Sequence, residues 1–190
     1  GTITGGDILI SAADFSSRTI TVNDNTSISG PELTIESNIL GSSLGGGSGN
    51  QNLVKSGAGA LLLSGTSSTY NVININSGTL QITNDGALGD NDFQLGTGST
   101  DARVEYVGTG ESIDNQVRLG NNTANNATVT GAGTIANTGS GTVTFTASSF
   151  NDGPRNASVT AARTVTFEGT SDIIVSGTIV DHNTAGGGTV

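Results

Sequence analysis

Short triplets, in which two apolar residues flank a third that is usually polar, recur along the whole chain. Val143–Thr144–Phe145 and Val165–Thr166–Phe167 are typical. Alternation with a period of two places the flanking pair on one face of a β-strand and the middle residue on the other. Similar triplets begin at Ile8, Ile20, Leu33, Leu61, Ile73, Leu80, Phe93, Val104, Val117 and Ile173. The chain is therefore expected to consist of very short strands that each bury one face.

The intervals between triplets indicate how these strands are arranged. Equal intervals lead from Leu80 to Val104 and from Phe93 to Val117. Similar ones lead from Ile8 to Leu33, from Val117 to Val143 and from Val143 to Val165. A repeat in the twenties made of short strands is typical of a β-solenoid, whose successive coils stack on one another. With ~24 residues per coil and ~4.8 Å between coils, we expect about eight coils. The alternative is a β-sandwich, which also has regularly spaced short strands.

Composition favours the solenoid and a single domain over residues 1–190. The chain has 30 Gly, 5 Phe, 2 Tyr and no Trp, Cys or Met. So much glycine disfavours helix, and a sandwich core normally contains larger aromatic residues. No composition shift marks a second domain. Residues 41–52 are rich in Gly and Ser, and we expect them to form a loop that bulges from one coil.

The net charge of −10 limits the partners of the chain. Nucleic acid and anionic membrane surfaces both require clustered Lys and Arg, so neither is expected to bind. No apolar run approaches the ~18 residues of a membrane helix, so we expect no insertion of this segment into a membrane. The absence of cysteine rules out disulfides and thiolate chemistry. The chain starts without a signal peptide, as expected for a mature product or an excised fragment.

The triplets predict which side chains face inward. The predicted core stack is Leu61, Leu63, Leu80, Ile82, Val143, Phe145, Val165 and Phe167. Middle residues should face outward, and most of them are polar. The exceptions are Leu9, Leu62 and Ile174. These three are either ordinary surface apolar residues or a contact strip for a partner.

Residues 53–89 resemble the autotransporter-associated β-strand repeat of bacterial secreted passenger domains. The positions that match in order are Lys55, Gly57, Gly59, Leu61, Leu63, Ser64, Gly65, Tyr70, Ile75, Gly78, Leu80, Ile82, Leu88 and Gly89. The chain departs from the repeat at Asn71–Val72, where the family usually has a Gly-rich turn. We expect Gly57, Gly59, Gly65 and Gly78 to permit turns with positive φ.

The resemblance implies a right-handed parallel β-helix, exported across the outer membrane to the bacterial cell surface or beyond. It also implies that the chain is a piece of a longer passenger. The repeat is a structural element that contributes no catalytic residues, so we expect no enzyme. We expect a rigid stalk or adhesin that associates with itself or with a cell-surface or glycan ligand. A filament subunit assembled end to end is an alternative, because open coil ends expose unpaired backbone groups.

Two groups of charged residues are candidate chemical sites. Asp85, Asp90 and Asp92 could bind Ca²⁺ weakly, although they lack the spacing of an EF-hand. Asp101, Glu105 and Asp114, with Arg103 and Arg118, could form a polysaccharide lyase or glycosidase site, since such sites need paired carboxylates. A surface ion pair is the simpler explanation for the second group. His182 is the only histidine, and we expect it to be solvated. No cofactor is expected.

Overall fold

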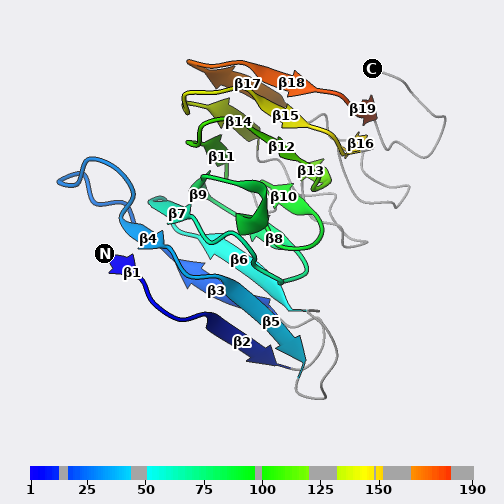
Figure 1. The fold of residues 1–190 in the computed structure, drawn as a ribbon. Helices are drawn as coiled ribbons and strands as arrows, with labels where there is room; N and C mark the ends of the chain where they lie inside the picture. The colour runs from blue at the N-terminus through cyan, green and yellow to red at the C-terminus, as the bar shows by residue number, and fades with distance from the viewer. Residues whose placement is uncertain are drawn as a thin grey trace.

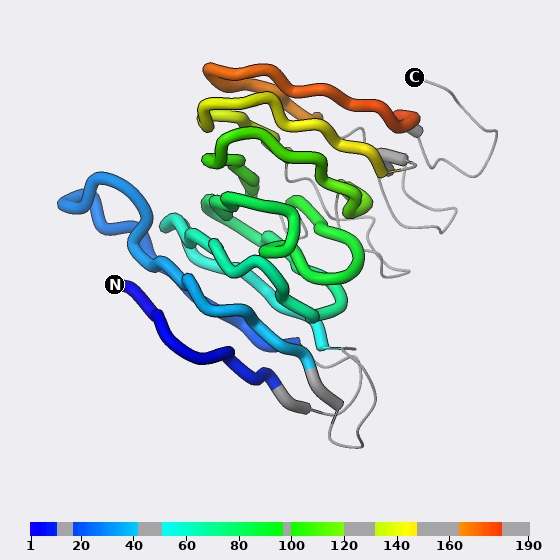
Figure 2. The backbone as a smooth tube through the Cα atoms, viewed as in Figure 1, coloured from blue at the N-terminus to red at the C-terminus, as the bar shows by residue number. Residues whose placement is uncertain are grey.

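The structure is a computed structural model that describes residues 1–12, 17–43, 51–96, 100–119, 132–147, 149–151 and 164–180. Its strands are short and pair in parallel wherever they pair. Successive coils rise from the N-terminal strands to the C-terminal ones, as Figure 1 and the backbone tube in Figure 2 show. Antiparallel hairpins, which a sandwich would contain, are absent from the described ranges. The chain is a parallel β-helix.

Two long sheets and a third face bound the helix. Sheet 1 has seven strands in the order β1-β4-β7-β9-β11-β14-β17. Their bounds are β1 Thr2–Ile3, β4 Leu33–Ile35, β7 Ala60–Leu63, β9 Gly78–Ile82, β11 Ala102–Tyr106, β14 Gly133–Asn137 and β17 Val165–Gly169.

Sheet 2 contributes one strand to each coil as well, in the order β3-β6-β8-β10-β13-β16-β19. Its strands are β3 Ser17–Thr21, β6 Asn52–Ser56, β8 Ile73–Ile75, β10 Phe93–Leu95, β13 Val117–Leu119, β16 Ser149–Asn151 and β19 Thr178–Val180.

The third face lies between a sheet 1 strand and a sheet 2 strand along the chain. It contains β2 Ile8–Ala12 paired with β5 Ile39–Ser43, and β12 Glu111–Ile113, β15 Val143–Phe145 and β18 Ile173–Val175. In the two middle coils this face has no strand. A short 3₁₀ turn, η1 Asp85–Ala87, takes its place in one of them. Backbone hydrogen bonds nevertheless cross these coils, from Thr69 N to Ile39 O and from Asp90 N to Tyr70 O (both 3.0 Å).

The described strands form seven coils, one fewer than the sequence predicts, and the coils differ in length. Leu61 pairs with Leu80 after a short coil, whereas Ile135 pairs with Phe167 after a much longer one. The two equal intervals, Leu80 to Val104 and Phe93 to Val117, are true register pairs. The other three intervals are wrong, because each joins strands of different faces. The register partner of Ile8, for example, is Ile39 rather than Leu33. Longer coils at both ends explain why fewer coils are formed.

The core is a continuous stack of aliphatic side chains with a few aromatic ones. Leu61, Leu63, Leu80, Ile82, Val143 and Phe145 are all buried in it. Val165 is partly buried against the same cluster. Phe167 departs from the predicted core stack, because 39% of its surface is exposed. It belongs to β17, the edge strand of sheet 1, and no described strand pairs along its far side.

The Gly/Ser-rich segment, residues 41–52, is strand at both of its ends, while residues 44–50 lie outside the described residues, so the bulging loop stays a prediction there. Gly41, Ser42 and Ser43 continue β5 and pair with Ile10, Ser11 and Ala12 of β2, and Asn52 begins β6. Backbone pairing holds these residues although their side chains give no strand signal. Gly41 also lies tightly against Tyr70, where a Cβ would come within 3.2 Å of the Tyr70 Cα. In the described part of the chain, no helix is long and apolar enough to cross a membrane.

Candidate functional site

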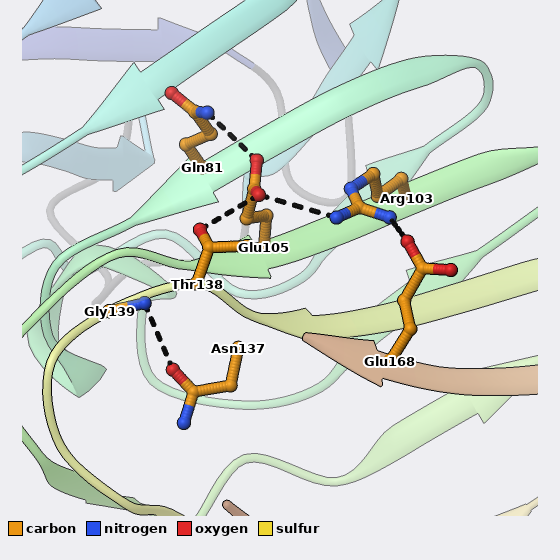
Figure 3. A network of polar contacts seen from close by, with 7 residues as sticks. All are labelled: Gln81, Arg103, Glu105, Asn137, Thr138, Gly139 and Glu168. Carbon is orange, nitrogen blue, oxygen red and sulfur yellow. Dashed lines mark hydrogen bonds and ion pairs between the residues drawn. The ribbon is translucent and has the colours of Figure 1, made fainter. Parts of the chain in front are cut away.

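A polar network on the outer face of sheet 1 centres on Glu105 (Figure 3). The Glu105 carboxylate accepts hydrogen bonds from Gln81 Nε2 on β9 (2.8 Å) and from Thr138 Oγ1 just after β14 (2.9 Å). Arg103 Nη2, on the same strand as Glu105, lies 3.3 Å from Glu105 Oε1. The other end of the Arg103 guanidinium pairs with Glu168 of β17. The network thus links four neighbouring strands.

This arrangement stabilises the stack and holds Glu105 ionised. Arg103 on β11 and Glu168 on β17 pair across the intervening strand β14. Ala136 of β14 lies in register between Glu105 and Glu168 and is only 1% exposed. Burial raises the pKa of Glu105, but hydrogen bonds from Gln81, Thr138 and Arg103 outweigh it and hold that pKa below its usual value. A carboxylate held in this state is a poor proton donor.

The candidate residues for sugar cleavage do not converge. Asp101 Oδ1 accepts a hydrogen bond from Ala132 N (2.9 Å), beside sheet 1. Asp114 follows β12 on the third face, and Arg118 lies on sheet 2, where its Nη2 is 2.6 Å from Asp92 Oδ2. Paired carboxylates facing one reacting bond, which glycoside cleavage requires, are therefore not formed by Asp101, Glu105 and Asp114. The ion pairs support the simpler explanation.

The acidic corner around η1 is the second polar region. Asp90, Asp92 and Asp114 line a polar hollow of about 310 Å³, together with Asn91, Asn115, Gln116 and Ala147. Asp92 is neutralised by Arg118. Among the described residues, no three His, Cys, Asp or Glu side chains are grouped so as to hold a metal ion. The expected trio of Asp85, Asp90 and Asp92 is therefore not assembled.

Asp85 has a different environment from the other carboxylates of this corner. Burial raises its pKa to about 6, and the charges of Asp114 and Glu111 add to this effect, although the Asp114 backbone N–H donates to it. Its Oδ1 is buried and accepts no hydrogen bond. Asp85 thus lies close to Asp114 and Glu111 and does not line the hollow to which Asp90 and Asp92 contribute.

Lys55 is the most unusual charged residue, because it is fully buried within the coil. Its Nζ donates to Gly57 O (2.7 Å), Ser77 O (2.9 Å) and Ser56 O (3.2 Å). These carbonyls belong to the corners that lead from sheet 2 to sheet 1 in two successive coils. Burial lowers the pKa of Lys55 to about 8, and the charge of Glu32 opposes this shift. Lys55 is therefore a structural cation that links two corners.

The glycines beside Lys55 allow these corners to stack closely. Gly57 and Gly78 have positive φ, +80° and +69°, and a Cβ on Gly78 would lie 2.4 Å from Gly57 O. Gly59 and Gly65 do not have positive φ, contrary to prediction. Close contacts require glycine at these two positions instead. A Cβ on Gly59 would lie 2.7 Å from the Asn23 carbonyl oxygen, and a Cβ on Gly65 would lie 2.7 Å from the Ser37 carbonyl oxygen. The Lys-Gly-Gly part of the motif thus has a structural explanation.

An amide ladder runs along the corner that precedes sheet 2. Asn71 Nδ2 donates to Asn52 Oδ1 (3.0 Å), and Asn91 Nδ2 donates to Asn71 Oδ1 (2.9 Å). In the next coil, Asn115 Nδ2 donates to the Gly89 carbonyl (3.1 Å) and also to that of Asn91. Such ladders repeat with the coil spacing and stabilise the register between coils.

The predicted contact strip is not formed. Leu9 is 64% exposed and Ile174 is 48% exposed, but Leu62 is only partly exposed. The three residues lie in three different sheets, β2-β5, β12-β15-β18 and sheet 1. They are therefore separate apolar residues on the surface.

Sequence reasoning missed the two buried cations. Lys55 is two residues after Leu53 on β6, so the alternation places both side chains on the inward face. A charged residue at such an otherwise apolar position is the signal that could have revealed it. Arg118 is the middle residue of its triplet, so the alternation predicts that its side chain faces outward, yet it is only 7% exposed. Gln94, its neighbour in register, is 4% exposed. No sequence signal indicated that these outward side chains would be covered. His182 lies outside the described residues.

The fold and its surface define a class of protein: a parallel β-helix whose polar networks hold coils together, without a convergent reactive group among the described residues. The chain is similar to the "Adhesin BmaC autotransporter" of Brucella suis biovar 1 (strain 1330), with 33% identity over 160 residues. That match covers 77% of this chain and 4% of the adhesin. This distant similarity supports the resemblance to autotransporter passengers. No family model matches the chain, and no solved structure matches it.

Proposed function

We propose that the chain is a non-catalytic segment of the stalk of a secreted autotransporter adhesin and presents its polar faces at the bacterial cell surface. The observation that carries this proposal is the Arg103–Glu105–Glu168 network, in which charged groups on the outer face are committed to linking coils. Such pairing favours a rigid surface over a reactive one. The similarity to an adhesin supports the same function.

Rigidity suits a stalk because a parallel β-helix grows in length by adding coils, while each coil contacts only its neighbours. The acidic surface, with a net charge of −10, keeps the rod soluble and resists nonspecific association with anionic surfaces. The partner is proposed to be a cell-surface glycan or protein, or another copy of the passenger.

Attachment assays can test this function directly. Beads coated with the folded chain should attach to an epithelial cell monolayer more than beads coated with Leu80→Asp, in which a charge replaces a fully buried core residue and unfolds the coils. The matched control is Leu9→Asp, which alters an exposed apolar residue and should leave the fold intact. Equal attachment by folded and unfolded chains would contradict an adhesive role.

The same preparation tests the enzymatic alternative. The folded chain is incubated with acidic and neutral polysaccharides, with and without Ca²⁺. We expect neither new reducing ends nor unsaturated products. Release of either product, abolished in Glu105→Gln, would overturn the non-catalytic proposal.

A further inference from the structure

The polar hollow of about 310 Å³ lies on the side of the rod, at the corner that leads from the third face to sheet 2. Its walls come from three successive coils, at residues 90–92, at residues 114–116 and at Ala147. Described coils continue on both sides of these three, through β8 below and β19 above. The hollow therefore stays on the lateral surface of the rod however many coils adjoin this segment.

The hollow carries an excess of negative charge. Three aspartates line it, Asp90, Asp92 and Asp114, and its described lining residues include no Lys, Arg or His. Arg118 reaches Asp92 from sheet 2, whereas Asp90 and Asp114 are exposed and form no ion pair with a described residue. A concave surface lined by one sign of charge concentrates ligands of the opposite sign.

Arg118 shows which kind of group this corner holds. Its Nη2 lies 2.6 Å from Asp92 Oδ2, and Gln116 Oε1 accepts hydrogen bonds from its Nε (3.1 Å) and its Nη2 (2.8 Å). A guanidinium is a planar fork of N–H donors, so a carboxylate and a carboxamide oxygen can accept from it together. One carboxylate and one carboxamide of the hollow thus already bind an arginine.

The same kinds of group recur beside this pair without an arginine. Continuing the register of β10 and β13 backwards places Asn91 beside Asn115, and Asn115 Nδ2 accordingly donates to Asn91 O. The residue before each of these asparagines is an aspartate, Asp90 or Asp114. Two carboxylates and a carboxamide from successive coils therefore line the hollow together.

Asn115 adds a buried acceptor that lacks a donor. Its side chain is 4% exposed, and its Nδ2 donates to the carbonyl oxygens of Gly89 (3.1 Å) and Asn91. Its Oδ1 is buried and accepts no hydrogen bond within the part of the chain that the structure describes. An unpaired buried acceptor is costly, so a donor that enters the hollow beside Asn115 is stabilised.

These groups favour an arginine side chain over other ligands. The carboxylates and the Asn115 oxygen all accept hydrogen bonds, so the ligand must donate several and carry positive charge. Among the described residues no group of three carboxylates or imidazoles could hold a metal ion. A sugar ring would find no aromatic side chain in the described lining, where Ala147 alone is apolar. A lysine presents its donors from one point, whereas a guanidinium spreads them over a plane.

We infer that the hollow binds an arginine side chain of a partner protein, whose guanidinium lies among Asp90, Asp114 and Asn115. This inference rests on the proposed adhesive function and narrows the partner to a protein with an exposed arginine. The net charge of −10 favours the approach of such a basic surface.

Nuclear magnetic resonance of the isotope-labelled chain tests the site. The probe is a capped Gly-Arg-Gly peptide, and the control is the same peptide with citrulline, which keeps the planar shape without the charge. We expect the arginine peptide to shift the backbone signals of residues 90–92 and 114–116 in a saturable way. The side-chain amide signals of Asn115 should shift with them, because its Oδ1 gains a donor. The citrulline peptide should leave all of these signals in place.

A pair of substitutions separates the site from general attraction. Asp90→Asn combined with Asp114→Asn should weaken peptide binding about tenfold or more, because charge-assisted hydrogen bonds are lost. Asp24→Asn combined with Asp172→Asn is the matched control, since it removes the same charge from exposed positions outside the hollow and should retain the affinity. The unshifted remainder of each spectrum shows that the variant is folded.

Four outcomes would each overturn the inference. They are equal weakening in both double variants, shifts at exposed acidic residues throughout the chain, no saturable shift at millimolar peptide, and shifts at the hollow caused by galactose but not by the arginine peptide.

The bead assay keeps the two proposals distinguishable. Beads coated with the Asp90→Asn and Asp114→Asn double variant should attach to the cell monolayer less than native beads. If native beads fail to attach while the native chain still binds the arginine peptide, the adhesive function fails and the binding site stands. If the double variant loses the peptide but attaches as native beads do, the adhesive function stands and the assignment of its partner fails.

Discussion

At the scale of single residues, the most informative position is a lysine buried where an aliphatic residue is expected. Lys55 remains in the core because three carbonyl oxygens accept its N–H groups. Its folded-state pKa of about 8 lies below the 10.5 of an ordinary lysine. Between these values the unfolded chain binds more protons than the folded one, so the free energy of unfolding should rise with pH.

Lys55→Met should remove this pH dependence. The native chain should gain about 2 kcal/mol in its free energy of unfolding between pH 7 and pH 10, whereas the variant should not. Urea unfolding at several pH values measures the difference. Arg18→Met, which removes an exposed cation, is the control and should keep the native slope. A variant with the native slope would show that Lys55 does not cause it.

Asp85 should have the opposite effect on stability. Its folded-state pKa of about 6 exceeds the ordinary value of 3.8, so the folded chain binds more protons in that interval. Ionised Asp85 therefore costs stability, and the cost is complete only above about pH 6.

Asp85→Asn should consequently stabilise the chain at neutral pH. We expect an increase of about 1 kcal/mol at pH 7, after allowing for solvent screening, and no difference below pH 4. Thermal unfolding at pH 7 and pH 3.5 measures both values. Asp90→Asn removes a carboxylate that is exposed in the same corner and should have a smaller effect. Equal stabilisation by both variants would indicate a general charge effect instead.

At the scale of strands and turns, the close stacking of corners makes certain glycines irreplaceable. Gly78→Ala should lower the free energy of unfolding by more than about 2 kcal/mol, because positive φ is strained for alanine and its Cβ would clash with Gly57 O. Gly6→Ala is the control, since Gly6 has open space around it. Urea unfolding compares them, and similar stabilities would contradict the stacking explanation.

The strands that alternation reveals could be predicted, and those defined by backbone pairing alone could not. The apolar triplets at Leu61, Leu80 and Val104 are strands β7, β9 and β11. β5 contains Gly41-Ser42-Ser43 and β12 contains Glu111-Ser112-Ile113, neither of which has the triplet pattern. Their neighbours in register hold them extended, and register depends on coil length, which varies.

The candidate site was only partly predictable for a related reason. The pairing of Arg103 with Glu105 follows from their positions two residues apart on one strand face. The pairing of Arg103 with Glu168 depends on which strands lie next to β14, and the pairing of Arg118 with Asp92 depends on a turn. A list of charged residues without register does not contain this information.

At the scale of the whole molecule, stability should decrease from the middle coils to both ends. The side chains of β7, β9 and β10 that face the core are buried, whereas all described side chains of β1 and β3 are at least partly exposed. In a solenoid each coil is stabilised by its neighbours, so exposed coils open first.

Hydrogen exchange should show this gradient. Backbone amides of β7 to β11 should exchange most slowly, and those of β1 to β3 and β17 to β19 fastest. Mass spectrometry of peptides after increasing exchange times gives the profile. Uniform protection at low concentration would contradict coil-by-coil stability.

The unequal coils also bear on how such a molecule can change over evolution. The short turn from Leu61 to Leu80 and the long turn from Ile135 to Phe167 advance the rod by the same axial step, because both add one strand to each long sheet. Sequence length can therefore be gained or lost at the bends without altering the pitch. New binding segments could be inserted at those bends while the length of the rod, and so its reach, stays constant.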